Sequence, residues 1–214
     1  MGNRERNTYV MERITRATLC LLEDHELSDI SVSQICQTAQ VSRNSFYRNF
    51  ESREDVLARH ISALLESWSE AYQGRATGSN AEMYGSLFAF LKKNAGLLLL
   101  LKRRGLFHLF ERAFMENWGP KAELENVAAY TVAFVSYGTY GWIEEWIARG
   151  MQESAEEMTS LLPQDGSKVR VRAVINGISA EYLHNSRRSG GVGTWATLVS
   201  LELLPEDQTI ISQK

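Results

Sequence analysis

A cluster of polar side chains with the chemistry of nucleic-acid recognition lies in the first quarter of the sequence. The cluster consists of Arg43, Asn44, Ser45, Tyr47 and Arg48. Guanidinium and amide groups can pair with base edges, and hydroxyl and phenol groups suit phosphate oxygens. Because no Asp or Glu occurs between Ile30 and Phe50, an anionic partner would meet no repulsion from this segment. The pattern favours DNA binding, and the alternative is an ordinary solvated face of a small helical hairpin.

These side chains need a short helix to present them, and the flanking residues predict one. An apolar stripe at helical spacing, consisting of Val32, Ile35, Cys36 and Ala39, predicts a first helix. Ser31 and Gln34 have the spacing of a capping box at its start. Ser42 is placed to cap a second helix over 43–49, which is too short to be stable unless it packs on the first. Ser52 then precedes a third helix that begins at Arg53, and a free helix N-terminus beside an Arg suits a phosphate.

The run VSRNSFYRNFESREDVL resembles the signature of the TetR family of bacterial transcriptional regulators, and the match extends over residues 8–58. The resemblance implies an all-α protein with an N-terminal three-helix helix-turn-helix DNA-binding domain and a C-terminal helical ligand-binding and dimerisation domain. It places Tyr47 and Arg53 at phosphates and residues 42–45 at the DNA surface. The complete predicted DNA-binding set is Ser31, Ser42, Arg43, Asn44, Ser45, Tyr47, Arg48 and Arg53.

Three positions depart from the family pattern. Gln40 stands where a Gly often makes the turn, so a positive φ at this residue would strain the backbone. Asn44 and Arg53 replace a common Gly and a common Lys. The amide of Asn44 adds a group that can alter which base is read.

Length and composition agree with a helical regulator in three segments: a DNA-binding domain over 1–58, a helical ligand-binding and dimerisation domain over 59–163, and an extension of unknown role over 164–214. The chain has 214 residues, is 44% hydrophobic and carries a formal net charge of −3. This charge excludes a protein that coats DNA indiscriminately, so DNA binding must come from a local patch. Cys20 and Cys36 have no metal or redox spacing and are interpreted as buried, reduced packing residues. Residues 169–184 are interpreted as one further amphipathic helix, and the rest of the extension as an arm around a partner subunit or a disordered tail.

The second domain is rich in aromatic side chains, which could line an apolar pocket. The predicted ligand-binding residues are Phe88, Phe107, His108, Phe114, Trp118 and Tyr137. The alternative for each aromatic residue is a place in the plain core, and for His108 a satisfied core or surface position. The basic triplet Lys102, Arg103 and Arg104 is interpreted as a solvated helix end rather than a nucleic-acid patch.

A long helix is predicted over 123–149, and Gly138 and Gly141 within it would permit close approach of another helix. A second capping box at Ser154 and Glu157 predicts a short helix after it. This run resembles a TetR subgroup that includes the activator of a dihydroxyacetone kinase operon, and the resemblance implies that both helices form a four-helix homodimer interface. A dimer also suits a pseudo-palindromic operator, because two recognition helices must meet major grooves roughly 34–36 Å apart or a multiple of that distance.

These patterns predict a transcriptional regulator, by family resemblance a repressor rather than an activator, that binds a double-stranded DNA operator as a homodimer. A small, largely apolar effector would release it. The alternative function is a TetR-like co-activator that acts through a partner protein without its own operator. The effector, the operator and the regulated genes are not encoded in any pattern of the sequence.

Other classes of protein are not expected. The sequence has no H-E-x-x-H, C-x-x-C, G-x-G-x-x-G, Walker or G-x-S-x-G motif, so we expect no enzyme, no catalytic residues, no cofactor and no metal. No apolar run approaches the ~18 residues that span a bilayer, so we expect a cytoplasmic protein without a membrane partner.

Overall fold

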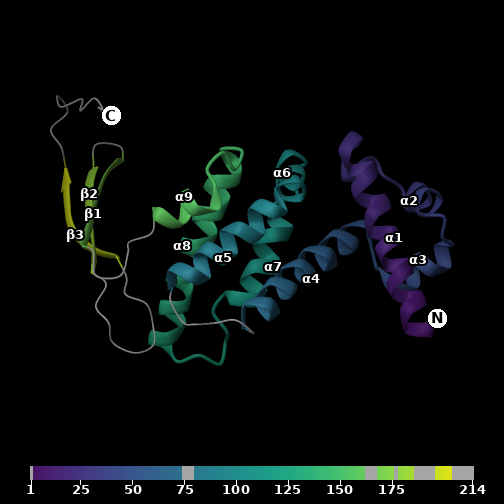
Figure 1. The fold of residues 1–214 in the computed structure, drawn as a ribbon, viewed down its shortest axis with the longest axis horizontal. Helices are drawn as coiled ribbons and strands as arrows, with labels where there is room; N and C mark the ends of the chain where they lie inside the picture. Colours follow the sequence, from purple (N-terminus) through teal and green to yellow (C-terminus); the bar gives the residue numbers. More distant parts are fainter. Residues whose placement is uncertain (1, 74–79, 162–167, 176–177, 186–195, 204–214) are drawn as a thin grey trace. The chain divides into compact units, whose positions relative to one another are not determined.

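The computed structural model describes residues 2–73, 80–161, 168–175, 178–185 and 196–203 (Figure 1). The chain divides into two compact units, one of Met1–Ala76 with Ala89–Ser154 and the other of Thr77–Phe88 with Ala155–Lys214. Helices are the regular structure of the described residues up to Ser160, which confirms the all-α prediction for this part of the chain. The predicted domain boundaries at 58/59 and 163/164 stay a prediction.

The first unit begins with the helix-turn-helix segment. Its elements are α1 (Asn3–Asp24), the 3-10 turn η1 (Leu27–Asp29), α2 (Val32–Ala39), α3 (Arg43–Asn49) and α4 (Arg53–Gln73). The capping box at the start of α2 is confirmed, because the Gln34 amide donates to Ser31 Oγ at 3.2 Å and the Ser31 amide donates to Gln34 Oε1 at 2.8 Å. Ile14, Ile35 and Phe46 are fully buried, so α1 packs against the inner faces of α2 and α3.

The turn between α2 and α3 contains a residue with a positive φ, Gln40. Gln40 has φ 51° and ψ 48°, in the left-handed region that side-chain-bearing residues avoid. Two hydrogen bonds hold the turn: the Val41 amide donates to Cys36 O at 3.0 Å, and Arg13 Nη2 donates to Gln40 Oε1 at 2.8 Å. The condition stated for strain at Gln40, a positive φ, is therefore met.

The rest of the first unit has an aromatic core. It contains α6 (Ala95–Arg103), α7 (His108–Trp118) and α8 (Asn126–Ala148). The long helix predicted over 123–149 is confirmed as α8, which begins three residues later and ends one residue earlier than predicted. Trp68 of α4 lies edge-on against Trp118 of α7, with ring centroids 5.5 Å apart. Because α4 is one continuous helix from Arg53, it links this aromatic core directly to the end of the helix-turn-helix.

The second unit contains most of α5 (Asn80–Lys93), α9 (Ala155–Ser160) and a three-stranded sheet. The strands β1 (Lys168–Ile175), β2 (Ile178–Asn185) and β3 (Ala196–Leu203) pair antiparallel in the order β1-β2-β3. Lys168 pairs with Asn185 and Ile175 with Ile178, so β1 and β2 form a hairpin.

The amphipathic helix predicted over 169–184 is therefore wrong. Val169, Arg170, Val171 and Arg172 alternate apolar and charged residues with a period of two, which is the pattern of a strand. Val also favours a strand because its branched side chain fits a pleated surface better than a helix.

Two side-chain predictions also need correction. Cys36 is buried but Cys20 is exposed, because Ala17 and Thr18 occupy the inward positions of α1 beside it. The basic triplet is not a simply solvated helix end, since the Arg104 side chain is only 16% exposed and its Nε donates to Leu22 O at 2.8 Å.

No single described helix is long and apolar enough to cross a membrane. The segments Ala81–Lys93 and Ala95–Arg103 pass that test only as a pair, and they meet at a bend of 69°.

Candidate nucleic-acid interface

Helix α3 buries one side and exposes its polar side chains on the other. Phe46 and Asn49 face the core, and the Phe46 ring packs on Phe50 with centroids 5.9 Å apart. The exposed residues are Arg43, Asn44, Tyr47 and Arg48, with Ser45 half-buried among them. Tyr47 is 61% exposed, and its ring stands edge-on against the buried Phe46 at 5.4 Å. The buried ring of Phe46 thus supports the exposed phenol of Tyr47.

Local hydrogen bonds hold the serines of the predicted DNA-binding set. Ser42 Oγ accepts the Ser45 amide at 3.1 Å, which confirms the predicted cap, and the two hydroxyls lie 3.0 Å apart. Asn49 Nδ2 donates to Ser45 O at 2.7 Å and holds the last turn of α3. Ser31 is exposed, but its hydroxyl already bonds Gln34 in the capping box of α2. Any contact of these serines with DNA would add to a role in capping.

Arg43 reaches from α3 to α2. Its Nη2 donates to Ser33 Oγ, so the two helices of the hairpin share a side-chain hydrogen bond. Burial raises the pKa of the neighbouring Cys36 thiol, although the charge of Arg43 opposes this effect. Sequence reasoning missed Ser33; its place outside the apolar stripe of α2 was the available signal.

Arg53 is placed differently from the exposed residues of α3. Its Nη1 donates to Ser28 O at 3.0 Å and to Ile30 O at 2.5 Å, and the residue is half-buried. The N-terminus of α4 also has its own acceptor, since Ser52 Oγ accepts the Asp55 amide at 3.1 Å. The predicted start of this helix at Arg53 is confirmed, but one backbone amide of its first turn already has a partner. The phosphate contact of Arg53 stays a prediction, and it would have to coexist with these carbonyl bonds.

Asp55 is held in its charged form by its neighbours. Burial would raise the pKa of this carboxyl, but hydrogen bonds from Arg59 and the Glu51 amide, together with the charges of Arg59 and Arg112, lower the pKa below its ordinary 3.8. Arg59 Nε lies 2.9 Å from Asp55 Oδ1, and its guanidinium covers the Phe50 ring at 5.7 Å. This network ties the start of α4 to the end of α3.

The structure brings together only some of the predicted ligand-binding residues. Phe107 and Phe114 are buried and flank the Tyr140 ring, with centroids 6.2 Å and 6.3 Å away, and Trp118 packs on Phe114 at 4.9 Å. His108 and Tyr137 lie on the surface. Phe88 is fully buried in the other compact unit, where it stacks on Tyr84 at 6.3 Å.

Tyr140 is the centre of this aromatic cluster, and sequence reasoning did not select it. Its hydroxyl donates to Glu111 Oε2 at 3.5 Å. Burial and the charges of Glu144 and Glu111 raise its pKa, so the phenol stays protonated and remains a hydrogen-bond donor. Spacing could not have singled it out, because residues three apart lie on the same side of a helix and Tyr137 is exposed.

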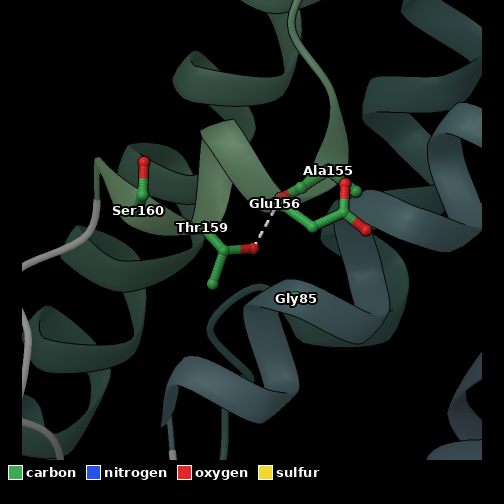
Figure 2. Close-up of a pocket in the computed structure, with 5 residues that line it drawn as sticks. All are labelled: Gly85, Ala155, Glu156, Thr159 and Ser160. Carbon is green, nitrogen blue, oxygen red and sulfur yellow. Dashed lines mark hydrogen bonds between the residues drawn. The ribbon is translucent and has the colours of Figure 1, made fainter.

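Two pockets lie away from these residues. One, of about 440 Å³, lies between α1 and α4 and includes Met11, Leu19, Phe50 and His60 in its lining. The other, of about 380 Å³, lies between α5 and α9 in the second unit, where Thr159 Oγ1 donates to Ala155 O beside Gly85 (Figure 2). None of the six predicted ligand-binding residues lines either of these two. Within the described part of the chain, no group of three or more His, Cys, Asp or Glu could hold a metal ion.

Helix α8 has an exposed apolar face. The face consists of Val127, Tyr130, Phe134, Tyr137 and Trp142, whose spacing places them along one side of the helix. Val127 is 79% and Tyr130 72% exposed. A Cβ added at Gly138 or Gly141 would meet no atom within 4 Å, so these positions leave the surface of α8 low enough for another helix to approach. Large exposed apolar patches are typical of interaction surfaces.

Two family models match the chain. Residues 14–59 match the model described as bacterial regulatory proteins, tetR family, and residues 81–164 match the model described as transcriptional regulator C-terminal region. The first match covers the second half of α1, all of α2 and α3 and the start of α4, and the second covers α5 from Ala81 through α9. No curated protein matches the chain.

Proposed function

The chain belongs to the TetR family of bacterial transcriptional regulators, and we propose that it acts as a repressor that binds a pseudo-palindromic operator as a homodimer until a small, largely apolar ligand releases it. Membership of this family makes the chain a DNA-binding transcriptional regulator. The observation that supports the proposal most is the exposed polar face of α3, backed by the buried ring of Phe46.

In this proposal α3 is the recognition helix and lies in a major groove. Arg43 and Asn44, in its first turn, suit base edges, because a guanidinium and an amide can each make two hydrogen bonds to a purine. Tyr47 and Arg48 lie about one turn further along and suit phosphates. Ser42 and Ser45 contribute to the same surface while they cap the helix. The net charge of −3 is consistent with affinity that comes from this local surface rather than from the whole protein.

The homodimer would form through the exposed apolar face of α8. Burial of apolar surface is the main driving force of protein association, and aromatic side chains such as Tyr130 and Phe134 supply much area for few rotatable bonds. A two-fold dimer presents two copies of α3 to successive half-sites, as a pseudo-palindrome requires. The resemblance to the subgroup that includes the activator of a dihydroxyacetone kinase operon implies that α8 and α9 form this interface.

The effector site would form at the aromatic cluster around Tyr140, with Phe107, Phe114 and Trp118 as apolar contacts. These rings pack directly on one another, so a ligand must separate them and thereby favour a second conformation. Trp118 contacts Trp68 of α4, and α4 leads to Arg53 beside the recognition helix. A ligand that binds the second conformation more tightly would shift the dimer towards it and away from the spacing that matches the operator.

The experiment that tests this proposal is selection of bound sequences from random duplex DNA at a stated salt concentration. Three proteins are compared: the wild type, an Arg43→Ala/Tyr47→Ala double variant, and Arg149→Ala, whose side chain is exposed at the far end of α8 and pairs with Glu145. We expect the wild type and Arg149→Ala to enrich one pseudo-palindrome and the double variant to enrich none. If the wild type enriches no sequence, the proposal that the protein binds its own operator is wrong. A co-activator that works through a partner protein then becomes the better hypothesis.

A further inference from the structure

The three basic residues at the end of α6 bond to α8 and to the C-terminal end of α1. Lys102 Nζ lies 3.1 Å from Glu144 Oε1 on α8. Arg103 Nη2 lies 2.7 Å from Glu23 Oε2 on α1. Arg104 bonds to the backbone of α1 and to Glu26 just beyond it. The end of α6 therefore touches both the helix with the exposed apolar face and the helix that packs behind α2 and α3.

Arg104 completes the C-terminus of α1. The last carbonyl oxygens of a helix have no partner within the helix, and its C-terminus carries partial negative charge. Residues 21–24 of α1 include no Lys or Arg that could serve there. Arg104 Nε donates to Leu22 O at 2.8 Å, Nη2 donates to Glu23 O, and Nη1 lies 2.8 Å from Glu26 Oε1. One guanidinium thus supplies donors and charge that the local sequence lacks.

The backbone that carries Arg104 is itself held in one conformation. Gly105 has φ +67°, a left-handed value that favours glycine. The Leu106 amide donates to Leu101 O at 2.8 Å and the Gly105 amide to Lys102 O at 3.2 Å, which is the hydrogen-bond pattern of a Schellman C-cap. Leu101 and Leu106 are both buried. The guanidinium of Arg104 therefore projects from an anchored helix end rather than from a mobile loop.

Arg103 and Arg104 differ in what they contribute, although they are adjacent. The pair of Arg103 with Glu23 is exposed, with 57% of each side chain accessible, and exposed ion pairs contribute little. Arg104 is 16% exposed and fills several acceptors at once with the planar geometry that only a guanidinium provides. The chain itself thus offers a matched control one residue away.

We propose that Arg104 is a positioning residue that fixes the orientation of the DNA-binding helices relative to α8, and so sets the half-site spacing that the protein accepts. The inference rests on the proposed function for its DNA readout. Because α1 packs against α2, a change in the pose of α1 moves the recognition helix with it. Without Arg104 the unit retains its helices but samples several orientations, and only a fraction of the molecules matches a given spacing.

The first test compares operator binding by the wild type, Arg104→Ala, Arg104→Lys and Arg103→Ala over a series of half-site spacings. If the competent fraction falls to about a tenth in Arg104→Ala, the apparent Kd at the best spacing rises about tenfold. We also expect its preference among spacings to flatten, whereas a loss of folded protein would weaken all spacings equally. Arg104→Lys should lie between, and Arg103→Ala should match the wild type. Unchanged spacing preference in Arg104→Ala would overturn the proposal.

The second test needs no DNA. A spin label on the exposed Cys20 of α1 and one on Ala148→Cys, exposed near the end of α8, report the distance between these helices within one subunit when labelled protein is diluted in unlabelled protein. We expect a narrow distance distribution in the wild-type and Arg103→Ala backgrounds and a broader or shifted one in Arg104→Ala and, less so, Arg104→Lys. An unchanged distribution in Arg104→Ala contradicts the inference, whereas a wild type that binds no operator contradicts only the proposed function.

Discussion

Helices α3 and α8 both expose a row of side chains to solvent, but the chemistry of the two faces is opposite. On α3 the exposed groups are a guanidinium pair, an amide and a phenol, whereas on α8 they are mostly aromatic and aliphatic. Polar groups exchange water for nucleic-acid partners at little cost, but apolar groups gain most when another apolar surface covers them. The comparison teaches that the composition of an exposed helix face indicates which kind of partner the face would suit.

The largest expected effect comes from placing a charge on the apolar face of α8. Phe134→Glu should give a monomer at micromolar concentration, because burying an unpaired carboxylate in a dimer interface costs several kcal/mol. Operator affinity should fall by about a hundredfold or more as the second half-site is lost. Sedimentation and operator titration measure both effects. Phe134→Leu keeps the face apolar and should remain a dimer; a dimeric Phe134→Glu would exclude this face as the interface.

The next effect concerns the phenol of α3. Tyr47→Ala should weaken binding to all DNA sequences by a similar factor, about tenfold, and should reduce the salt dependence little, because a phenol contacts phosphate without a charge. Titration with selected and random duplexes measures this. Tyr47→Phe separates the hydroxyl from the ring. Wild-type affinity in Tyr47→Ala would remove this residue from the interface.

Replacing Asn44 should change the preference for particular base pairs more than the overall affinity for DNA. Asn44→Ala should relax discrimination at one base pair of each half-site by about 1–3 kcal/mol, the usual contribution of a good bidentate contact, and leave random-sequence binding unchanged. Repeating the sequence selection with this variant shows the change directly. If every position loses preference equally, Asn44 positions the helix rather than reading a base.

The pH dependence of stability should report the carboxylate that ties α3 to α4. The pKa of Asp55 is lowered in the folded protein, so its ionised form adds stability above the ordinary value of 3.8, and this stability is lost as pH falls through the folded pKa. Asp55→Asn should lower the free energy of unfolding by about 1 kcal/mol at neutral pH. Between pH 5 and 2 the free energy of unfolding should then change less in this variant than in the wild type. Chemical denaturation at several pH values measures both. Equal acid sensitivity in the two proteins would contradict this role.

The smallest effect concerns the turn that precedes α3. Gln40→Gly should stabilise the protein by up to about 1 kcal/mol, because glycine adopts the positive φ of this position without strain. The loss of the exposed hydrogen bond from Arg13 subtracts little from this gain. Thermal unfolding measures the shift. Gln40→Ala is the control, since it removes the same hydrogen bond but keeps a Cβ and should not stabilise.

Much of the helix-turn-helix could be predicted from the sequence because its signals are local. The serine caps of α2, α3 and α4 depend on residues within three positions of one another, and all of them form. The sequence also marked Gln40 as a turn position where a positive φ would cause strain, and its φ is 51°. The hairpin of β1 and β2 was equally local in its alternation, and the error there was a misjudged period rather than missing information.

The candidate ligand site was harder to predict because burial depends on neighbours that are distant in the sequence. Phe107 and Tyr137 are both aromatic residues predicted to bind the ligand, yet Phe107 is 5% and Tyr137 56% exposed. Which ring enters the core depends on the rotation of each helix in its final packing, and a pattern of aromatic residues does not contain that rotation.

By itself the sequence determined the family, the helix-turn-helix, its caps and the polar character of α3, because these depend on residue type and spacing over a few turns of chain. Only the tertiary structure decided that Arg53 bonds to the carbonyl oxygens of Ser28 and Ile30, that Tyr140 lies at the centre of the aromatic cluster, and that Arg104 caps α1. A helix end can take its missing partner from any residue that the fold brings near, and that choice is made by packing rather than by local sequence.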